Sequence, residues 1–387
     1  MIKESNRKQR KYIPTRFLIF PIIVLTVLSF AGCGPSADDL AAVDYTPMVR
    51  DDWEVSTPAE QGLDPGPVAR MYYKAASIDT IYSLLVVKNG YLVAEDYFNS
   101  GSIDELGKRA SVTKSYTSAL VGIALDQGYI KSVDQKMLDF YPDIAGQVTD
   151  QRKKEITIRN MLEMRPGYPW EEKNAAAWEA LWSGEYLSQI AKIPLTADPG
   201  TSFQYSNLTA HWLGIIAARA SGMDLITLGN KYLFGPLGVV PGEDWLRDVD
   251  GYYIGCGDIL FTARDMAKFG LLYLNDGVYE RERIIPDEWV HDSLQTYTVN
   301  EFEVSSIGRF KNMGYGYMWW SAKVGDRHIN FAWGHGGQLI VLDHDNDIVV
   351  VTTADPFWGK DTHFDAWKYE EAIIKMVSDF IYALPAG

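Results

Sequence analysis

Two kinds of hydrophobic pattern divide this chain, with strand-like runs on either side of a mainly helical middle. Residues 81–87 and 91–98 are rich in β-branched and aromatic residues and flank an Asn89-Gly90 turn, which predicts a β-hairpin. The pattern in the last quarter of the chain predicts further strands, followed by a helix that covers the sheet. The strands are expected at 315–320, 329–333, 338–342 and 348–353, and the amphipathic helix at 364–384.

The middle of the chain carries helical signals. Residues 119–125 are apolar on nearly every side, which is the pattern of a helix buried all round. Residues 208–220 predict a second helix that ends near Gly222. Thr262 and Asp265 have the spacing of a capping box, which predicts the start of a third helix.

The start of the buried helix carries candidate chemistry. Ser111 and Lys114 are three residues apart, so on a helix they lie on one face and can share a proton. Because burial disfavours a charged ammonium, such a lysine can accept a proton from a neighbouring hydroxyl. The alternative is an N-capping serine beside a lysine that reaches solvent, and Ser5 and Lys8 show that the spacing also arises by chance.

Residues 1–32 have the layout of an export signal. Six basic residues precede the apolar run from Phe17 to Phe30, which Pro21 interrupts and which is shorter than the roughly 20 residues of a membrane-spanning helix. Ala31-Gly32-Cys33 resembles a bacterial lipoprotein signal, although Phe30 stands where leucine is usual. We therefore expect an exported protein anchored to the cell envelope through a lipid on Cys33. An ordinary cleaved signal is the alternative.

The residues after Cys33 are polar and aperiodic, and 33–60 is expected to be a tether. Gly34 suits an outer-membrane destination in a Gram-negative host. Loss of residues 1–32 removes six basic residues and one acidic residue, which changes the formal net charge from −15 to −20. Nucleic acid is therefore a poor partner, because it would repel the protein. Cys256 is the only other cysteine in the sequence, so no disulfide is expected.

Three short motifs stand in order along the chain: Ser111-Val112-Thr113-Lys114, Tyr205-Ser206-Asn207 and His335-Gly336-Gly337. With the flanking segments 199–207 and 261–270, this set resembles the serine hydrolases of the β-lactamase and penicillin-binding-protein superfamily. The resemblance is strongest to the branch of class C β-lactamases, D-aminopeptidase-like esterases and 6-aminohexanoate-dimer hydrolases. It implies an α+β fold of the β-lactamase/DD-peptidase type in a domain spanning 61–387. A mostly antiparallel sheet would be flanked by helices, with a mainly helical lobe inserted at roughly 112–290.

The resemblance also implies roles for the motif residues. Ser111 would be the nucleophile, and Lys114 the base that receives its proton. Tyr205 would pass a proton to the leaving group and help activate water. Asn207 would orient Lys114 or a substrate carbonyl. On a strand at one wall of the cleft, His335, Gly336 and Gly337 would lead to Gln338, whose N–H would form the oxyanion hole with that of Ser111. No metal or cofactor is expected.

The third motif departs from penicillin-recognising members, which usually carry Lys-Thr-Gly. Lysine offers a full positive charge to a substrate carboxylate, whereas His335 is only partly charged near neutral pH. We therefore expect a small ester or amide substrate, with Trp333, Trp319 and Tyr317 as a candidate wall for its acyl chain. One alternative is a β-lactamase or D,D-peptidase acting on peptidoglycan-related substrates. Another is a slowly acylated module that senses a ligand, although a pure binder needs no base beside its serine. His335 itself could instead make only a structural hydrogen bond.

Overall fold

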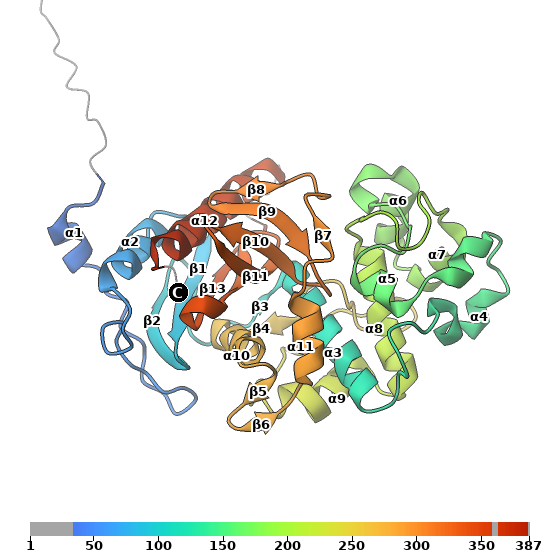
Figure 1. Cartoon of the computed structure of the whole chain (residues 1–387), viewed down its shortest axis with the longest axis horizontal. Helices are drawn as coiled ribbons and strands as arrows, with labels where there is room; N and C mark the ends of the chain where they lie inside the picture. Colours follow the sequence, from blue (N-terminus) through green and yellow to red (C-terminus); the bar gives the residue numbers. More distant parts are fainter. Residues whose placement is uncertain (1–33, 358–362, 386–387) are drawn as a thin grey trace, which may run out of the picture.

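The computed structural model describes residues 34–357 and 363–385, and in this part of the chain a nine-stranded antiparallel sheet forms the centre (Figure 1). Both ends of the domain build it, since the N-terminal hairpin pairs with the last strand. The expected mostly antiparallel sheet is therefore confirmed. Its strands, in spatial order, are β2 (Tyr91–Tyr97), β1 (Ile81–Lys88), β13 (Ile348–Ala354), β12 (Gln338–Asp343), β11 (Arg327–Gly334), β10 (Trp320–Val324), β9 (Phe310–Tyr315) and β7 (Thr298–Val299), with β8 (Ser306–Ile307) also paired to β9.

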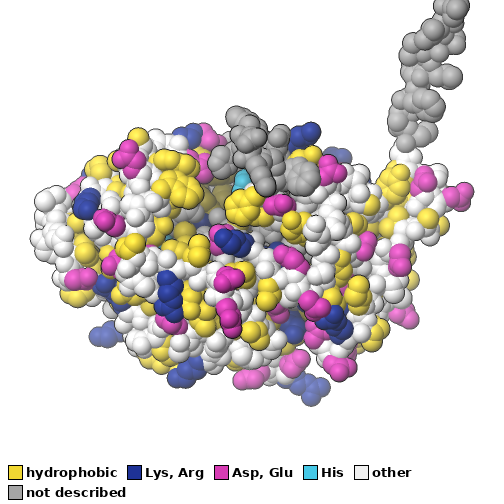
Figure 2. All heavy atoms as spheres, turned by 180° about the vertical axis from the view of Figure 1, so that it is seen from behind, with side chains coloured by type: hydrophobic (Ala, Val, Ile, Leu, Met, Phe, Trp, Pro, Cys, Tyr) yellow, Lys and Arg dark blue, Asp and Glu magenta, His cyan; other side chains and the backbone are white. Residues whose placement is uncertain are grey.

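A mainly helical lobe lies beside the sheet (Figure 1). Figure 2 views the molecule from behind and shows a hollow near the junction of the two parts, with hydrophobic side chains at its rim. The helices of the lobe are α3 (Thr113–Asp126), α4 (Pro142–Ala145), α5 (Ile158–Leu162), α6 (Ala175–Ser183), α7 (Tyr186–Lys192), α8 (Asn207–Ser221) and α9 (Leu225–Gly229). Two short antiparallel pairs complete the described strands: β3 (Gly107–Lys108) with β4 (Leu260–Phe261), and β5 (Val278–Tyr279) with β6 (Glu282–Arg283).

Three helices were well predicted because their end signals are local. α3 is buried from Thr113 to Ala124, as its all-round apolar pattern indicated. α8 ends at Gly222, which adopts the left-handed conformation of a C-cap. α10 (Ala263–Leu274) begins with the expected capping box of Thr262 and Asp265.

Helices cover both faces of the sheet. α10 lies on one face against β1, β12 and β13, although it falls inside the range 112–290 expected for the inserted lobe. α3, the helix that follows Ser111, packs chiefly on α8 and not on the first hairpin. α2 (Pro65–Ala75) and α12 (His363–Ala383) pack together on the opposite face, and α12 matches the expected covering helix. α11 (Asp287–Leu294) packs Trp289 against Gly122 of α3.

The strand expected at 315–320 is wrong. β9 ends at Tyr315 and β10 begins at Trp320, with a buried turn between them. Met318 in this turn has φ +63°, and its carbonyl accepts a hydrogen bond of 2.8 Å from Ser115 of α3. Because the turn is buried, its hydrophobic pattern is the same as that of a buried strand.

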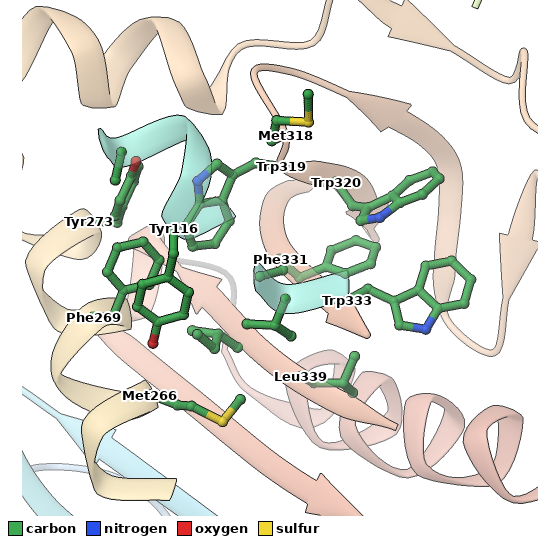
Figure 3. Close-up of a cluster of buried hydrophobic side chains, with 14 of the residues drawn as sticks. Tyr116, Met266, Phe269, Tyr273, Met318, Trp319, Trp320, Phe331, Trp333 and Leu339 are labelled. Atoms are coloured by element: carbon green, nitrogen blue, oxygen red, sulfur yellow. The ribbon is translucent and has the colours of Figure 1, made fainter. Parts of the chain in front are cut away.

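Trp319 and Tyr317 from this turn belong to the core. Trp319 packs on Phe269 and Tyr273 of α10 (Figure 3), and both Trp319 and Tyr317 are fully buried. They therefore do not form the acyl-chain wall for which they were candidates. Trp333 lies on the opposite side of the cluster drawn in Figure 3.

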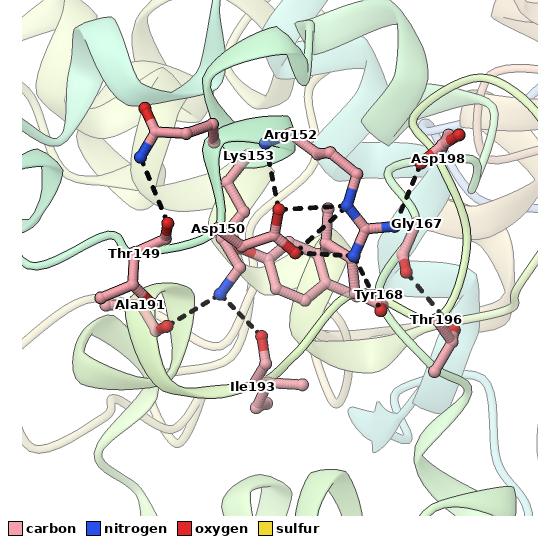
Figure 4. A network of polar contacts seen from close by, with 12 residues as sticks. Thr149, Asp150, Arg152, Lys153, Gly167, Tyr168, Ala191, Ile193, Thr196 and Asp198 are labelled. Carbon is pink, nitrogen blue, oxygen red and sulfur yellow. Dashed lines mark hydrogen bonds and ion pairs between the residues drawn. The ribbon is translucent and has the colours of Figure 1, made fainter.

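A buried lysine holds the loops of the helical lobe together. Lys153 is 1% exposed and donates to the carbonyls of Ala191 and Ile193 at 2.7–2.8 Å (Figure 4). It also donates to the Ile190 carbonyl at 2.9 Å. Burial lowers the pKa of Lys153 to about 8. The Tyr168 hydroxyl donates to the same Ile190 carbonyl at 2.7 Å, which holds the loop around Tyr168 against α7.

Much of the segment expected to be a tether, 33–60, packs on the domain. After the short helix α1 (Ala37–Ala41), the carbonyl of Tyr45 accepts from the Glu95 amide at 2.9 Å. The carbonyl of Met48 accepts from Arg264 at 2.6 Å. The backbone of this segment thus bonds to the domain, which its lack of periodicity in the sequence did not indicate.

Cys33 and the residues before it lie outside the described residues. The export signal of 1–32 and the lipid on Cys33 therefore stay predictions. Within the residues that the structure describes, every helix is too short or too polar to cross a membrane.

Candidate active site

Ser111 lies in a single 3-10 turn, Ala110–Val112, directly ahead of α3. Ala110 has φ +42°, which is uncommon for a residue with a Cβ. Its carbonyl accepts hydrogen bonds from the Thr113 hydroxyl at 2.6 Å and the Asp258 amide at 3.2 Å. Backbone strain of this kind persists only where neighbouring contacts hold it, and it is concentrated at functional sites.

Lys114 joins the serine turn to two other segments. It is 1% exposed, and its Nζ lies 2.9 Å from Ser111 Oγ, 2.7 Å from Asn207 Oδ1 and 2.9 Å from the Cys256 carbonyl. The residue that caps α3 is Val112, which makes no side-chain cap bond. The alternative, in which Ser111 caps the helix and Lys114 extends into solvent, is therefore wrong.

The loop that presents the Cys256 carbonyl is anchored by a buried histidine. The Gly255 amide donates to His211 Nδ1 at 3.1 Å, and His211 Nε2 lies 2.9 Å from Asp248 Oδ2. Because a backbone N–H can only donate, Nδ1 accepts, and the ring proton is on Nε2 facing Asp248. This pair holds one of the three acceptors around Lys114 in place.

The second motif lies at the start of α8. Asn207 is the first residue of that helix and contacts Lys114 rather than pointing away from it. The Tyr205 ring has its centroid 4.9 Å from Lys114 Nζ and stacks on Trp320 at 5.5 Å. The structure thus brings Ser111, Lys114, Tyr205 and Asn207 together.

Glu171 supports this second motif, and the sequence analysis missed it. Its Oε1 accepts from the Ser206 hydroxyl at 2.7 Å and from the Leu208 amide at 2.9 Å, which holds the start of α8. Burial raises the pKa of the Glu171 carboxyl. It is followed by the charged residues Glu172 and Lys173, so no local signal marked it as buried.

The third motif was expected on a strand, and this expectation is wrong. His335, Gly336 and Gly337 form the turn between β11 and β12. Gly336 and Gly337 have φ of +82° and +97°, a region that favours glycine. His335, the first residue of the turn, has a partly exposed side chain. Glu370 of α12 contacts this turn and was also missed, because nothing in its helical neighbourhood points to it.

Gly334, the last residue of β11 before the turn, lies close to the backbone at Ser111. A Cβ on Gly334 would lie 3.1 Å from the Ser111 amide nitrogen and 2.6 Å from the Arg109 carbonyl. Gln338 begins β12, and its buried side chain donates to the Ala354 carbonyl at 2.6 Å. The backbones of the serine turn and of residues 334–338 therefore face each other at close range.

Arg109, which belongs to none of the three motifs, links the residue before the serine turn to the side chain of Gln338. Its Nε donates to the Phe261 carbonyl at 2.7 Å, and its Nη1 lies 3.4 Å from Gln338 Oε1. The guanidinium is almost fully buried, which lowers its pKa although Glu105 opposes the shift.

Aromatic rings border the site beside Tyr205. Phe302 lies 4.9 Å from Trp320, 6.4 Å from Trp333 and 6.2 Å from Tyr205, measured between ring centroids. Of the three residues considered for an acyl-chain wall, only Trp333 belongs to this group. The loop that carries Phe302 reaches the helical lobe through ion pairs, which are Glu301 with Arg165 at 2.5 Å and Glu303 with Lys173.

A family model described as Beta-lactamase matches residues 82–370. The chain belongs to the Beta-lactamase family. The 6-aminohexanoate-dimer hydrolase of Paenarthrobacter ureafaciens is 25% identical over 76% of this chain and 79% of its own length. The D-alanyl-D-alanine-carboxypeptidase/endopeptidase AmpH of Escherichia coli K12 is 25% identical over 62% and 67%.

Solved structures share this β-lactamase-family fold. A putative 6-aminohexanoate-dimer hydrolase from Bacillus anthracis has a TM-score of 0.62 at 20% identity and covers 81% of this chain and 82% of its own. EstCE1, a hydrolase with promiscuous acyltransferase activity, has a TM-score of 0.63 at 16% identity, covering 80% and 94%. Its membership of this family and its hydrolase relatives identify the protein as a serine hydrolase.

Proposed function

We propose that this serine hydrolase cleaves an ester or amide bond of a small molecule through an acyl-enzyme on Ser111. The 2.9 Å contact between Lys114 Nζ and Ser111 Oγ carries the proposal. Asn207 Oδ1 and the Cys256 carbonyl occupy two N–H positions of a neutral Lys114, so its lone pair faces the serine hydroxyl. A serine hydroxyl is a weak nucleophile without such a base.

The reaction follows from this geometry. Lys114 takes the hydroxyl proton as Ser111 Oγ attacks the substrate carbonyl, and the new oxyanion accepts hydrogen bonds from the Ser111 and Gln338 amides. Tyr205 then passes a proton to the leaving alcohol or amine as its bond to carbon breaks. Tyr205 recovers its proton from the water that attacks the acyl-enzyme, and Lys114 returns its proton to Ser111 Oγ as the bond from Oγ to the acyl carbon breaks, which releases the acid and the free serine.

Similarity to the 6-aminohexanoate-dimer hydrolase supports an ester or amide substrate, and so does the absence of lysine from the third motif. A second candidate is a D,D-peptidase or β-lactamase, which the similarity to the AmpH carboxypeptidase favours.

Intact-mass analysis after exposure to a fluorophosphonate tests the nucleophile. We expect one adduct on the wild type and none on Ser111→Ala. Ser115→Ala is the matched control, because Ser115 is a neighbouring buried serine bonded to the Met318 carbonyl, and this variant should still be labelled. A folded wild type without an adduct would favour the ligand-sensing alternative. Stable labelling by penicillin would favour the second candidate.

We also propose that the protein is exported and anchored through a lipid on Cys33, which the basic and apolar pattern of residues 1–33 supports. Metabolic labelling with an alkyne fatty acid in a bacterial host should mark the wild type and Cys256→Ser but not Cys33→Ser. Labelling that survives in Cys33→Ser would contradict this proposal.

A further inference from the structure

A cavity of about 440 Å³ lies away from the proposed active site. Its wall is formed by Asp276 after α10, by α11 and the two residues that follow it, by the start of β11 and by His344 between β12 and β13. β11 joins the two places, because His328 lines the cavity and Gly334 lies beside the Ser111 backbone. At roughly 3.3 Å per residue, these ends of the strand are roughly 20 Å apart. The cavity is therefore separate from the three motifs.

Polar side chains make up most of the cavity wall. Three of them are histidines, at positions 291, 328 and 344, and amides and a hydroxyl accompany them. The Asn330 amide nitrogen donates to the Leu294 carbonyl at 2.9 Å, which leaves the amide oxygen as an acceptor. In the described part of the chain, the Asp276 carboxylate and the His344 ring form no hydrogen bond with the protein. Both can therefore bond to a ligand.

The charges of the wall do not suit an anion. Partial burial lowers the pKa of His328 and of His344 below the ordinary value near 6.5, although Asp276 opposes the shift at His344. At pH 7 these two rings are therefore mostly neutral, and each offers one donor and one acceptor nitrogen. Among the described residues that line the cavity, Asp276 supplies the only carboxylate, and there is no lysine or arginine. A phosphate or carboxylate ligand would meet repulsion without a compensating cation.

Two other classes of ligand also fit poorly. Within residues 34–357 and 363–385, no three side chains of His, Cys, Asp or Glu are arranged to hold a metal ion. An apolar ligand would find only Val290 and Leu294. It would remove water from the polar groups without replacing their hydrogen bonds, which is unfavourable.

We propose that this cavity binds a small neutral sugar. Each sugar hydroxyl both donates and accepts hydrogen bonds, which matches the imidazoles, the amides and the carboxylate of the wall. The C–H groups of the sugar ring would lie against Val290 and Leu294. Small-molecule sites usually enclose roughly 300–1,000 Å³, and this cavity is within that range. Binding here goes beyond the proposed hydrolysis and does not depend on it.

Saturation-transfer NMR at pH 7 tests the proposal on the full-length protein, purified in a detergent without a sugar headgroup. The probes are three pairs that differ by one carboxylate: glucose with glucuronate, galactose with galacturonate, and mannose with mannuronate. We expect saturable binding of at least one neutral sugar, and at least threefold weaker binding of its uronate because of Asp276. Absence of saturable binding by all three neutral sugars overturns the proposal, as does tighter binding of the uronate.

Variants locate the bound sugar. Asp276→Ala and His344→Ala each remove a hydrogen-bonding group at an exposed position, so the affinity should fall about two- to tenfold. Asp345→Ala is the matched control, because Asp345 is adjacent to His344 and exposed but does not line the cavity, and it should bind the sugar as the wild type does. Equal affinity in the wild type, Asp276→Ala and His344→Ala overturns the proposal.

Labelling of Ser111 separates this cavity from the active site. Protein that has reacted with a fluorophosphonate should bind the sugar with unchanged affinity, because the cavity is roughly 20 Å from the serine turn. Loss of binding after labelling would place the sugar at the active site and overturn the proposal. If the protein binds the sugar but resists the fluorophosphonate, the proposed hydrolysis fails while the sugar site stands.

Discussion

On the helical side of the candidate site the groups that we propose for catalysis are side chains, whereas on the sheet side they are backbone amides placed by other residues. Lys114 makes three polar contacts of 2.7–2.9 Å on the helical side. On the sheet side, Gly334 allows the close approach of two backbones, and Arg109 and Glu370 hold them. The helical side should therefore be sensitive to the chemistry of its side chains. The sheet side should be sensitive to the volume and position of its backbone.

The largest effect is expected for Lys114→Met, which removes the proposed base while filling similar space. We expect kcat to fall about 10²–10⁴-fold, the usual contribution of a general base. Lys153→Met is the matched control, because Lys153 is equally buried and also makes three polar contacts, but within the helical lobe. Ester hydrolysis per folded molecule separates the two variants. Equal losses in both would mean that Lys114 is only structural.

Gly334→Ala tests the sheet side without changing any polar group. The added Cβ would lie 2.6 Å from the Arg109 carbonyl, so one of the two backbones must move. A displacement of about 1 Å in an active site costs roughly 10²-fold in rate, which is the loss we expect in kcat. Gly146→Ala, with open space around its Cβ, should retain wild-type kcat. Full activity in Gly334→Ala would show that this close approach is not needed for catalysis.

Phe302→Ala tests the place where the helical side and the sheet side of the site are in contact. Its ring contacts Trp320 and Trp333 of the sheet and Tyr205 of the helical side. Aromatic pairs contribute about 0.5–1.5 kcal/mol each beyond their buried area, so we expect kcat/KM to fall by roughly two- to tenfold. Phe98→Ala, at the far edge of the sheet beside Tyr72, is the control. A similar change in both variants would remove Phe302 from the site.

The smallest expected effect concerns the stability contributed by His335. Glu370 raises the folded-state pKa of His335, so this contribution is fully present below the unfolded pKa of about 6.5 and is lost as pH rises through the folded pKa. The free energy of unfolding lost in His335→Gln should therefore be larger at pH 5 than at pH 8. Because the side chain is 40% exposed, we expect a difference below about 1 kcal/mol in urea titrations. The same substitution at exposed His291 is the control, and a larger loss at pH 8 would contradict the assignment.

Local signals explain which parts of the fold were predictable. The Asn89-Gly90 hairpin and the caps at Gly222 and Thr262 depend on neighbours within four residues, and the structure has all of them. The turn at 316–319 was mistaken for a strand because burial, which depends on distant helices, removes the polar residues that mark exposed turns. Residues 44–53 show no periodicity in the sequence, yet their backbone bonds to the domain through contacts with distant residues.

The candidate site divides in the same way. The sequence by itself determined the three motifs, the family and hence the serine hydrolase activity, because residue types at short spacings carry that information. Only the tertiary structure decided that Arg109, Glu171 and Glu370 support the motifs and that the third motif is a turn bonded to Glu370. The physical reason is that a hydrogen bond or ion pair is set by distance in space, and Glu370 is 34 residues from the glycine amide that it binds.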